Sequence, residues 1–557
     1  MALNKKIQFL FLFLFLDVFS FAQTAPRTYL VSFTNKAGTP YSINSPSAYL
    51  SPRAIARRSN HAIAIDSTDL PVNSWYVDSL NNISGVNVIC KSKWFNNATI
   101  LVNDTSVLSQ VQALPFVLNV KSSCAGSPAT VDPHLKTHVS QPRGNNYFFQ
   151  DTLGYGAASN QIKMLNGHFL HQMGFKGEGV YIAVMDLGFR EIDVLPQYEH
   201  LRSTGRIIQG PDFVHRDGSV FNGGGNHGTL VLSCMAPFAN GEFIGTAPEA
   251  TYFLFVTEND TSEYVVEEDY WIAAAEWADS AGVDVFNTSL GYTTFNDSLQ
   301  NHTYADLDGN TTRITRGVDL AAKKGILSVN SAGNSGTSAW YYIGAPADCD
   351  SCLTVGAVKY DGTYAPFSSK GPTADGRIKP NVVAQGDSTY LIWPGNVIAD
   401  GNGTSFSGPV MAGAAACLWQ AFPEKSNMEI IQAIGNTASS YDALGNFTGQ
   451  GIPDMFRAWE YLKQERLIVD DIHFIVRNNP FSDNFSVVFY PEKSAEIGLL
   501  LYDAQGRIVA QKPVSLLTNT PNEQTLDLHD NLLKPGVYFL KVSLSTGFFT
   551  SFKLVKQ

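Results

Sequence analysis

The chain has 557 residues, of which 38 are Lys or Arg and 50 are Asp or Glu, so its formal net charge is −12. At roughly 150 residues per domain, this length predicts three or four domains. Charged residues make up only 16% and aromatic residues 12%, which excludes a disordered chain. The acidic balance and the lack of a long basic run exclude an electrostatic nucleic-acid binder, so we expect no nucleic-acid partner.

The N-terminus has the three parts of a secretory signal peptide, which we expect to occupy residues 1–22. Lys5 and Lys6 precede an apolar run at 7–16, and Ser20 and Ala22 offer small side chains for cleavage. A run of about 10 residues is too short to span a bilayer, which requires about 20. Since no other segment approaches that length, we expect no transmembrane helix in the mature form.

The next segment, residues 23–121, predicts a small α+β module. Ser51 is placed to cap a short helix that has Pro52 at its first position. Residues 122–146 are rich in Ser, Gly, Pro and Thr without apolar periodicity, which is typical of a linker. Within the module, strands are expected at 28–33, 84–89, 98–102 and 117–120, and helices at 51–58, 71–80 and 107–114.

Residues 147–468 alternate between short apolar strands and helices. This pattern predicts an α/β fold, a parallel sheet covered by helices on both faces. Functional sites in such sheets gather at the carboxyl ends of the strands. Strands are expected at 180–185, 252–256, 283–286, 326–330 and 353–358, and helices at 229–235, 266–281, 317–324 and 405–421.

In the last segment, residues 472–557, the helical patterns stop. Alternating stretches at 486–490, 496–502 and 537–542 are separated by Gly-containing turns at 503–506 and 534–536. Short strands with regular turn signals predict an all-β sandwich.

Six cysteines are consistent with an oxidising compartment. Cys349 and Cys352 form a lone C-x-x-C, which could be a local disulfide, a redox pair or half of a metal site. No second pair or nearby His pair completes a zinc site, so a local disulfide or two free thiols is favoured. Cys234 and Cys417 lie on apolar helical patterns and are expected to be buried.

Three short segments carry side chains suited to nucleophilic catalysis. Asp186 ends a buried strand, His227 begins a helix and Ser405 begins another. A serine hydroxyl requires an adjacent base, and that base requires a third group to fix its tautomer. At a helix N-terminus, backbone N–H groups can also stabilise a developing oxyanion.

Each segment alone is also explained by capping or by a structural role, but the order Asp, His, Ser on an α/β pattern is far more specific. Over about residues 147–465 the chain resembles the subtilisin-like serine proteases, the subtilases. The resemblance implies that Asp186 orients His227, that His227 is the general base and that Ser405 is the nucleophile. It also implies that Asn334, in the segment 331–334, donates to the oxyanion.

Further segments match that family. Ser289, Leu290 and Gly291 resemble its substrate-cleft segment, and residues 344–347 and 367–372 also have counterparts. The sequence departs from the family at Leu187 and Leu232, where smaller residues are usual. These departures affect the expected shape of the cleft rather than the triad.

The flanking segments resemble two accessory modules. Residues 23–121 resemble, in position and size, an inhibitory and chaperone-like subtilase prodomain. Residues 472–557 resemble a sorting domain for type IX secretion, with a carbohydrate-binding or adhesive sandwich as the alternative. The motifs that carry the second resemblance lie at 479–481, 501–509, 533–540 and 553–556.

The sequence offers little support for metal chemistry. His168 and His171 have helical spacing but no third ligand, so a surface pair is expected. The segment from Asp306 through Asp308 to Gly309 could be a calcium turn, although Asp-Gly is primarily a turn signal. We expect no cofactor and no metal in catalysis, and structural calcium only as the resemblance allows.

The expected function is a secreted serine endopeptidase that is made as a precursor and acts through an acyl-enzyme. The alternative is a catalytically inactive surface binding protein with the same fold. The expected partners are protein or peptide substrates, the type IX secretion machinery and the chain's own prodomain. The expected location is outside the cell or at its surface, after export through the periplasm of a Gram-negative bacterium.

Overall fold

The computed structural model describes residues 27–123, 153–222, 225–440, 444–463, 467–469, 472–477, 481–491, 494–517, 522–528, 533–544 and 549–556. The expected signal peptide and most of the expected linker lie outside these residues. In the described part of the chain, no helix is long and apolar enough to cross a membrane.

Residues 27–123 form an α+β unit, which we call the prodomain unit, around an antiparallel sheet of order β2-β3-β1-β4. Ser51 caps α1 by accepting from the Ala54 amide at 3.0 Å, as predicted. Helix α2 begins three residues later than expected because Asn73 caps it. The elements are β1 (Thr28–Phe33), α1 (Pro52–Asn60), α2 (Ser74–Asn81), β2 (Val86–Ser92), β3 (Asn97–Val102), α3 (Leu108–Gln112) and β4 (Val117–Ser122).

The central unit is built on a parallel sheet of order β13-β12-β11-β10-β5-β9-β6, counted over the described residues between 153 and 463. All neighbouring strands in it run parallel, which confirms the predicted fold class. Its strands are β5 (Tyr181–Asp186), β6 (Ile207–Asp212), β9 (Thr251–Val256), β10 (Val285–Thr288), β11 (Leu327–Ser331), β12 (Leu353–Val358) and β13 (Val382–Gln385). The sequence did not predict β6 and β13, the two edge strands.

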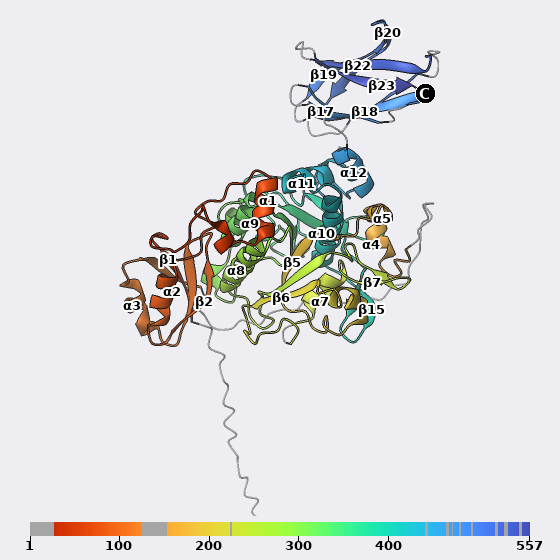
Figure 1. Ribbon diagram of the computed structural model, residues 1–557. Coiled ribbons are helices and arrows are strands. Elements are labelled where there is room, and N and C mark those ends of the chain that lie inside the picture. The colour runs from red at the N-terminus through yellow and green to blue at the C-terminus, as the bar shows by residue number, and fades with distance from the viewer. Residues whose placement is uncertain are drawn as a thin grey trace, which may run out of the picture.

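Both faces of this sheet are covered by helices (Figure 1). On β5, Ile182 and Val184 join the core under α7 (His227–Ser233) and α10 (Thr404–Ala421). Ala183 and Met185 point the other way, into the core under α8 (Val266–Ala281) and α9 (Arg313–Lys323). This alternation explains why the strand is apolar throughout.

Shorter elements surround the central sheet. They are α4 (Ser159–Lys163), α5 (Gly167–Gln172), α6 (Glu199–Arg202), α11 (Asn427–Asn436), α12 (Met455–Lys463) and the paired strands β7 (Phe238–Ala239) with β8 (Phe243–Ile244) and β14 (Thr389–Trp393) with β15 (Val397–Gly401).

The C-terminal unit is a β-sandwich, as predicted. One sheet contains β16 (Leu467–Val469), β17 (Ile472–Arg477), β18 (Asn484–Pro491) and β21 (Asn522–Asp527), and the other contains β19 (Ala495–Asp503), β20 (Ile508–Leu516), β22 (Gly536–Leu544) and β23 (Phe549–Lys556). Their facing side chains, such as Val487 and Leu501, share one core. Because β16 pairs with β17, the sandwich includes residues 467–469, so the expected boundaries at 468 and 472 fall inside one sheet.

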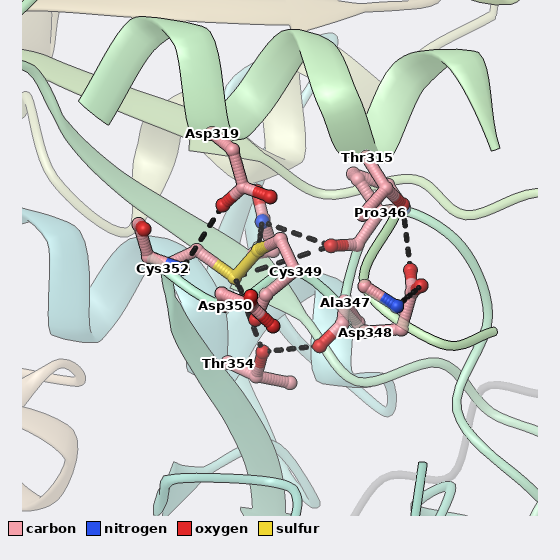
Figure 2. Close-up of a disulfide and its surroundings, with 12 residues drawn as sticks. Thr315, Asp319, Pro346, Ala347, Asp348, Cys349, Asp350, Cys352 and Thr354 are labelled. Carbon is pink, nitrogen blue, oxygen red and sulfur yellow. Dashed lines mark hydrogen bonds between the residues drawn. A yellow bond between two sulfur atoms is a disulfide. The ribbon is translucent and has the colours of Figure 1, made fainter. Parts of the chain in front are cut away.

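Cys349 and Cys352 form a disulfide in the loop that precedes β12, which selects one of the alternatives left open by the sequence (Figure 2). The loop is held to α9, because Thr315 donates to Asp348 at 2.6 Å and the Ser351 amide donates to Asp319 at 3.0 Å. Cys234 and Cys417 are buried free thiols, as expected.

Candidate active site

The candidate residues meet at the carboxyl edge of the central sheet. Asp186 is the last residue of β5, Ser289 follows β10 directly, and Asn334 lies three residues beyond the end of β11. The register pairs Thr288 with Met185 and with Asn330, so the three strands end at the same level. Parallel topology therefore brings together side chains that are far apart in the sequence.

Asp186 and His227 form the first pair of the site. The Asp186 carboxylate is buried, and its Oδ1 accepts hydrogen bonds from His227 Nδ1 at 2.8 Å and from the Leu187 amide at 2.7 Å. Gly228 permits this approach, since a Cβ there would lie 3.1 Å from Asp186 Cβ and would overlap the Gly188 carbonyl. Burial alone would lower the pKa of His227, but the facing Asp186 carboxylate outweighs it, and the pKa is raised above 6.5.

Ser405 is the second residue of α10. The ring of the next residue, Phe406, is 6.3 Å from the His227 ring. Ser405 Oγ donates to the Ser289 carbonyl at 3.3 Å, and Ser289 Oγ donates to the Ser405 carbonyl at 3.1 Å. Among the described contacts, Ser405 Oγ makes no hydrogen bond to His227. The structure therefore joins Asp186 to His227 by a hydrogen bond but does not join Ser405 to that pair.

Asn334 is fixed by the residue that precedes Ser405. Its Oδ1 accepts from the Thr404 amide at 2.9 Å and from Thr404 Oγ1 at 3.1 Å, so its NH₂ group is left to donate elsewhere. Ser331 Oγ donates to the Thr404 carbonyl at 2.7 Å and thereby ties β11 to the first turn of α10. The sequence did not predict these roles of Thr404 and Ser331, although Ser331 begins the predicted segment 331–334 and Thr404 directly precedes Ser405.

A cavity of about 240 Å³ opens beside Ser405. Ser289, Leu290 and Gly291 line it together with Asn334, and their role in binding substrate stays a prediction. The remaining lining residues are small or carry hydroxyl groups: Thr293, Ser331, Ala332, Gly333, Ser335, Gly344, Ser369 and Thr404. A larger cavity, of about 420 Å³, lies between the prodomain unit and α8, and none of the predicted site residues lines it.

The residues of the two metal hypotheses form hydrogen bonds within the protein. His171 is buried, and its ring contacts Tyr155 OH at 3.0 Å and the Thr246 carbonyl at 3.1 Å, so the expected surface pair is wrong for this residue.

Asp306 accepts from the amide and the hydroxyl of Thr303. Asp308 accepts from two amides and one hydroxyl in its own turn. Both aspartates thus stabilise turns, and calcium at this position stays a prediction.

The prodomain unit docks against α8. Glu276 Oε2 accepts from the Lys93 amide at 2.6 Å, and its Oε1 accepts from the Trp94 amide at 2.9 Å. Two turns earlier, Asp269 accepts from the Thr99 hydroxyl at 3.0 Å. The acidic residues of α8 therefore satisfy polar groups of the prodomain unit that are buried in the contact.

A second set of contacts reaches the C-terminal end of α8. Asp279, whose side chain is fully buried, pairs with Arg57 at 2.6 Å, with Arg58 at 2.9 Å and with Lys93 at 3.3 Å. Gly282 follows α8 with φ +94°, and a Cβ there would lie 2.8 Å from Arg53 Cβ. Helix α1 can therefore lie against this end of α8 only because the residue after it has no side chain.

Comparison with known proteins agrees with this geometry. Residues 177–452 match the subtilase family. The chain is 30% identical to subtilisin DY of Bacillus licheniformis over 52% of its own length and 92% of the relative's. The chain belongs to the subtilase family. It is also 29% identical to subtilisin E of Bacillus subtilis (strain 168), over 58% and 78% of the two chains, and 31% identical to subtilisin BL of Lederbergia lenta, over 51% and 91%.

The flanking units have family matches of their own. Residues 28–137 match the peptidase S8 propeptide domain of Bacteroidota, and residues 478–557 match the secretion system C-terminal sorting domain. The subtilase is therefore made with a propeptide, and its sorting domain indicates export by type IX secretion to the outside or the surface of the cell. Both resemblances stated from the sequence are confirmed.

Proposed function

We propose that this subtilase is an active serine endopeptidase that hydrolyses peptide bonds of proteins through Asp186, His227 and Ser405. The observation that carries the proposal is the Asp186–His227 hydrogen bond, together with a serine in the first turn of α10 whose neighbour Phe406 lies 6.3 Å from the His227 ring. The neighbouring cavity and the positioned Asn334 amide supply a place for substrate and a donor for the oxyanion.

The reaction follows from the positions of these groups. Ser405 Oγ attacks the substrate carbonyl while His227 Nε2 accepts the hydroxyl proton, and Asp186 holds the ring through Nδ1. For this step the Ser405 hydroxyl turns from the Ser289 carbonyl to His227, since hydrogen bonds of unliganded sites tighten in the substrate complex. The oxyanion accepts hydrogen bonds from Asn334 Nδ2 and from an amide at the start of α10.

The imidazolium of His227 then protonates the leaving amine, and an acyl-enzyme on Ser405 remains. Water, deprotonated by His227, hydrolyses the ester and restores the serine. In this mechanism substrate lies as an extended strand along 289–291, where Gly291 is exposed and makes no backbone hydrogen bond to the described residues. No metal or cofactor takes part in any step.

The precursor is proposed to pass through the periplasm of a Gram-negative bacterium before type IX export, with the prodomain unit holding the peptidase inactive until it is cleaved. The contacts of Glu276 and Asp279 with that unit support a prodomain unit that stays docked on the peptidase in the precursor. Deletion of 472–557 should then leave the protein in the periplasm, and unchanged delivery to the surface would contradict the sorting role.

A fluorophosphonate probe tests the catalytic proposal directly. Matured protein should be labelled at Ser405, and labelling should be lost in His227→Ala and in Ser405→Ala. Ser335→Ala, a hydroxyl deletion at the edge of the same cavity, is the matched control and should keep its label. Correctly matured protein that takes no label would support the alternative, a subtilase fold that serves as an inactive surface binding protein.

A further inference from the structure

Three glutamates converge beside the cleft, at the start of α8. Glu258 follows β9, Glu263 lies in the connection to α8, and Glu267 is in the first turn of that helix. One carboxylate oxygen from each lies within 4.8 Å of the others. Glu258 is 7% exposed and Glu267 is 2% exposed, while Glu263 is half-buried.

No ion pair balances this cluster in the described part of the chain. Among the described ion pairs, none involves Glu258, Glu263 or Glu267, so no lysine, arginine or histidine side chain pairs with them. Burying several carboxylates without a counter-charge is costly, and such groups are usually paired or bind a metal. Burial, reinforced by the neighbouring carboxylates, raises the pKa of both Glu263 and Glu267.

An unpartnered atom at the cluster points to a missing ligand. Oε2 of Glu267 is completely buried and accepts no hydrogen bond from a described N–H group or hydroxyl, so the side chains that interact with the Glu267 carboxyl are the other acids of the cluster, Glu258 and Glu263. The other oxygen of Glu267 accepts only a long bond of 3.4 Å from the Tyr264 amide. A buried carboxylate oxygen normally has a partner, so this atom is explained if a cation lies between the three side chains.

The donor set selects the class of cation. All three groups offer oxygen, which hard divalent cations prefer, and calcium binds oxygen at 2.3–2.6 Å in flexible geometry. Two such bonds on opposite sides of one ion span about 5 Å, which matches oxygens that lie within 4.8 Å of one another. We propose that Glu258, Glu263 and Glu267 bind one calcium ion.

A cation here would stabilise the wall of the cleft. Tyr292, directly after the cleft segment, donates its hydroxyl to both oxygens of Glu258 at 2.8 Å. Thr257, the residue before Glu258, donates its amide to the Asp186 carbonyl at 3.0 Å. The ion would therefore order residues 257–265 between the substrate segment and the triad, and this role does not depend on whether the chain is an active peptidase.

Calcium binding to the full chain tests the proposal without any activity measurement. The protein carries Ser405→Ala to prevent self-cleavage and is stripped with a chelator. In equilibrium dialysis with calcium, Glu263→Gln and Glu267→Gln should each bind one ion fewer than the parent, or bind it at least tenfold more weakly. Asp260→Asn removes the same charge from an exposed position in the same connection and should bind as the parent does.

Terbium luminescence gives a second readout, because the Tyr292 ring next to Glu258 can transfer excitation to a bound lanthanide. The parent and Asp260→Asn should show terbium luminescence that decreases when calcium displaces the terbium. Glu263→Gln should show no calcium-sensitive terbium luminescence. The Gln variants should fold, since each removes repulsion from the metal-free cluster, and melting at or above the temperature of the chelator-treated parent would verify this.

Equal calcium stoichiometry and affinity in the parent and in both Gln variants would overturn the proposal. A second result would also overturn the proposal. In it, Glu263→Gln binds as much calcium as the parent but, with Ser405 restored, no longer cleaves peptides that carry lysine or arginine. The cluster would then bind a cationic side chain of the substrate instead of calcium.

Discussion

Replacing Asp279 with alanine should weaken the docking of the prodomain unit without unfolding the peptidase unit. All three cations that contact this carboxylate, Arg57, Arg58 and Lys93, belong to the prodomain unit. Once that unit has left, the end of α8 has lost these partners, so the mature peptidase gains little from Asp279. The substitution thus separates docking from folding.

The structure sets the size of the effect. The side chains of Asp279, Arg57 and Arg58 are 0%, 3% and 1% exposed, so removing the carboxylate leaves buried guanidinium charge uncompensated. Breaking a buried pair in this way costs about 3–5 kcal/mol. Arg58 keeps Asp69 at 2.6 Å, which favours the lower half of that range. A loss of about 3–4 kcal/mol corresponds to docking roughly 150- to 1,000-fold weaker.

Hydrogen exchange of the full precursor carrying Ser405→Ala measures this loss, because the tether keeps the unit docked while the opening free energy falls. Protection in α1 and β2 should drop by that factor, while β5 and β11 keep theirs. Asp66→Asn is the matched control: Asp66 pairs with Lys324 across the same contact but is 56% exposed, so it should cost less than about 1 kcal/mol.

Lowering the pH should reproduce part of the loss of docking free energy that Asp279→Ala causes. Burial would raise the pKa of Asp279, but Lys93, Arg58 and Arg57 outweigh it and lower the pKa from 3.8 to about 2. A lowered carboxylate pKa stabilises the docked state above pH 3.8, and this stabilisation is lost as the pH falls through about 2. The loss amounts to about 2 kcal/mol, less than for alanine because the protonated acid can still form hydrogen bonds. If Asp279→Ala loses no more protection than Asp66→Asn, the buried network does not anchor the prodomain unit.

Three further outcomes are expected. Asn334→Ala should lower kcat about 10²- to 10³-fold on a peptide substrate with little change in KM, because its amide stabilises the oxyanion only in the transition state. The acid limb of the pH profile of kcat/KM should have an apparent pKa above 6.5, because His227 must be neutral to act as base and Asp186 raises its pKa. Asp186→Asn should therefore shift the NMR titration of His227 to lower pH. Cys349→Ser should lower the free energy of unfolding by about 2 kcal/mol, the value for a short closed loop, and reductant should have no effect on that variant.

The sequence predicted the positions of the candidate residues along the fold better than it predicted the contacts around them. Asp186, His227, Ser405 and Asn334 each stand next to a strand or helix boundary that periodicity reveals, and parallel topology then brings them to one edge of the sheet. The bond between Asn334 and Thr404 could not be predicted in this way, because it joins two loops whose approach depends on how α10 packs on β11.

The edge strands show a second limit. Strand β6 ends in Gln209, Gly210, Pro211 and Asp212, and its register with β9 shifts there, so it lacks the continuous apolar run of β5. Central strands are buried on both faces and have a clear apolar signal, whereas an edge strand can be polar and irregular. The sequence signal is therefore weakest at the two sides of the sheet.

The acidic residues of α8 carry a sequence signal for the docking of the prodomain unit. Asp269, Glu276 and Asp279 are seven and three residues apart, so they lie along one side of a helix that is otherwise mostly apolar. Buried acids at helical spacing indicate a partner surface with donors and cations, which the prodomain unit supplies through Thr99, Lys93 and the α1 arginines. Because these groups are buried, salt should screen the contact only weakly, whereas protonation of Asp279 removes part of it directly. High salt alone should therefore leave the prodomain unit docked after its cleavage, because the buried charges of the contact are screened only weakly.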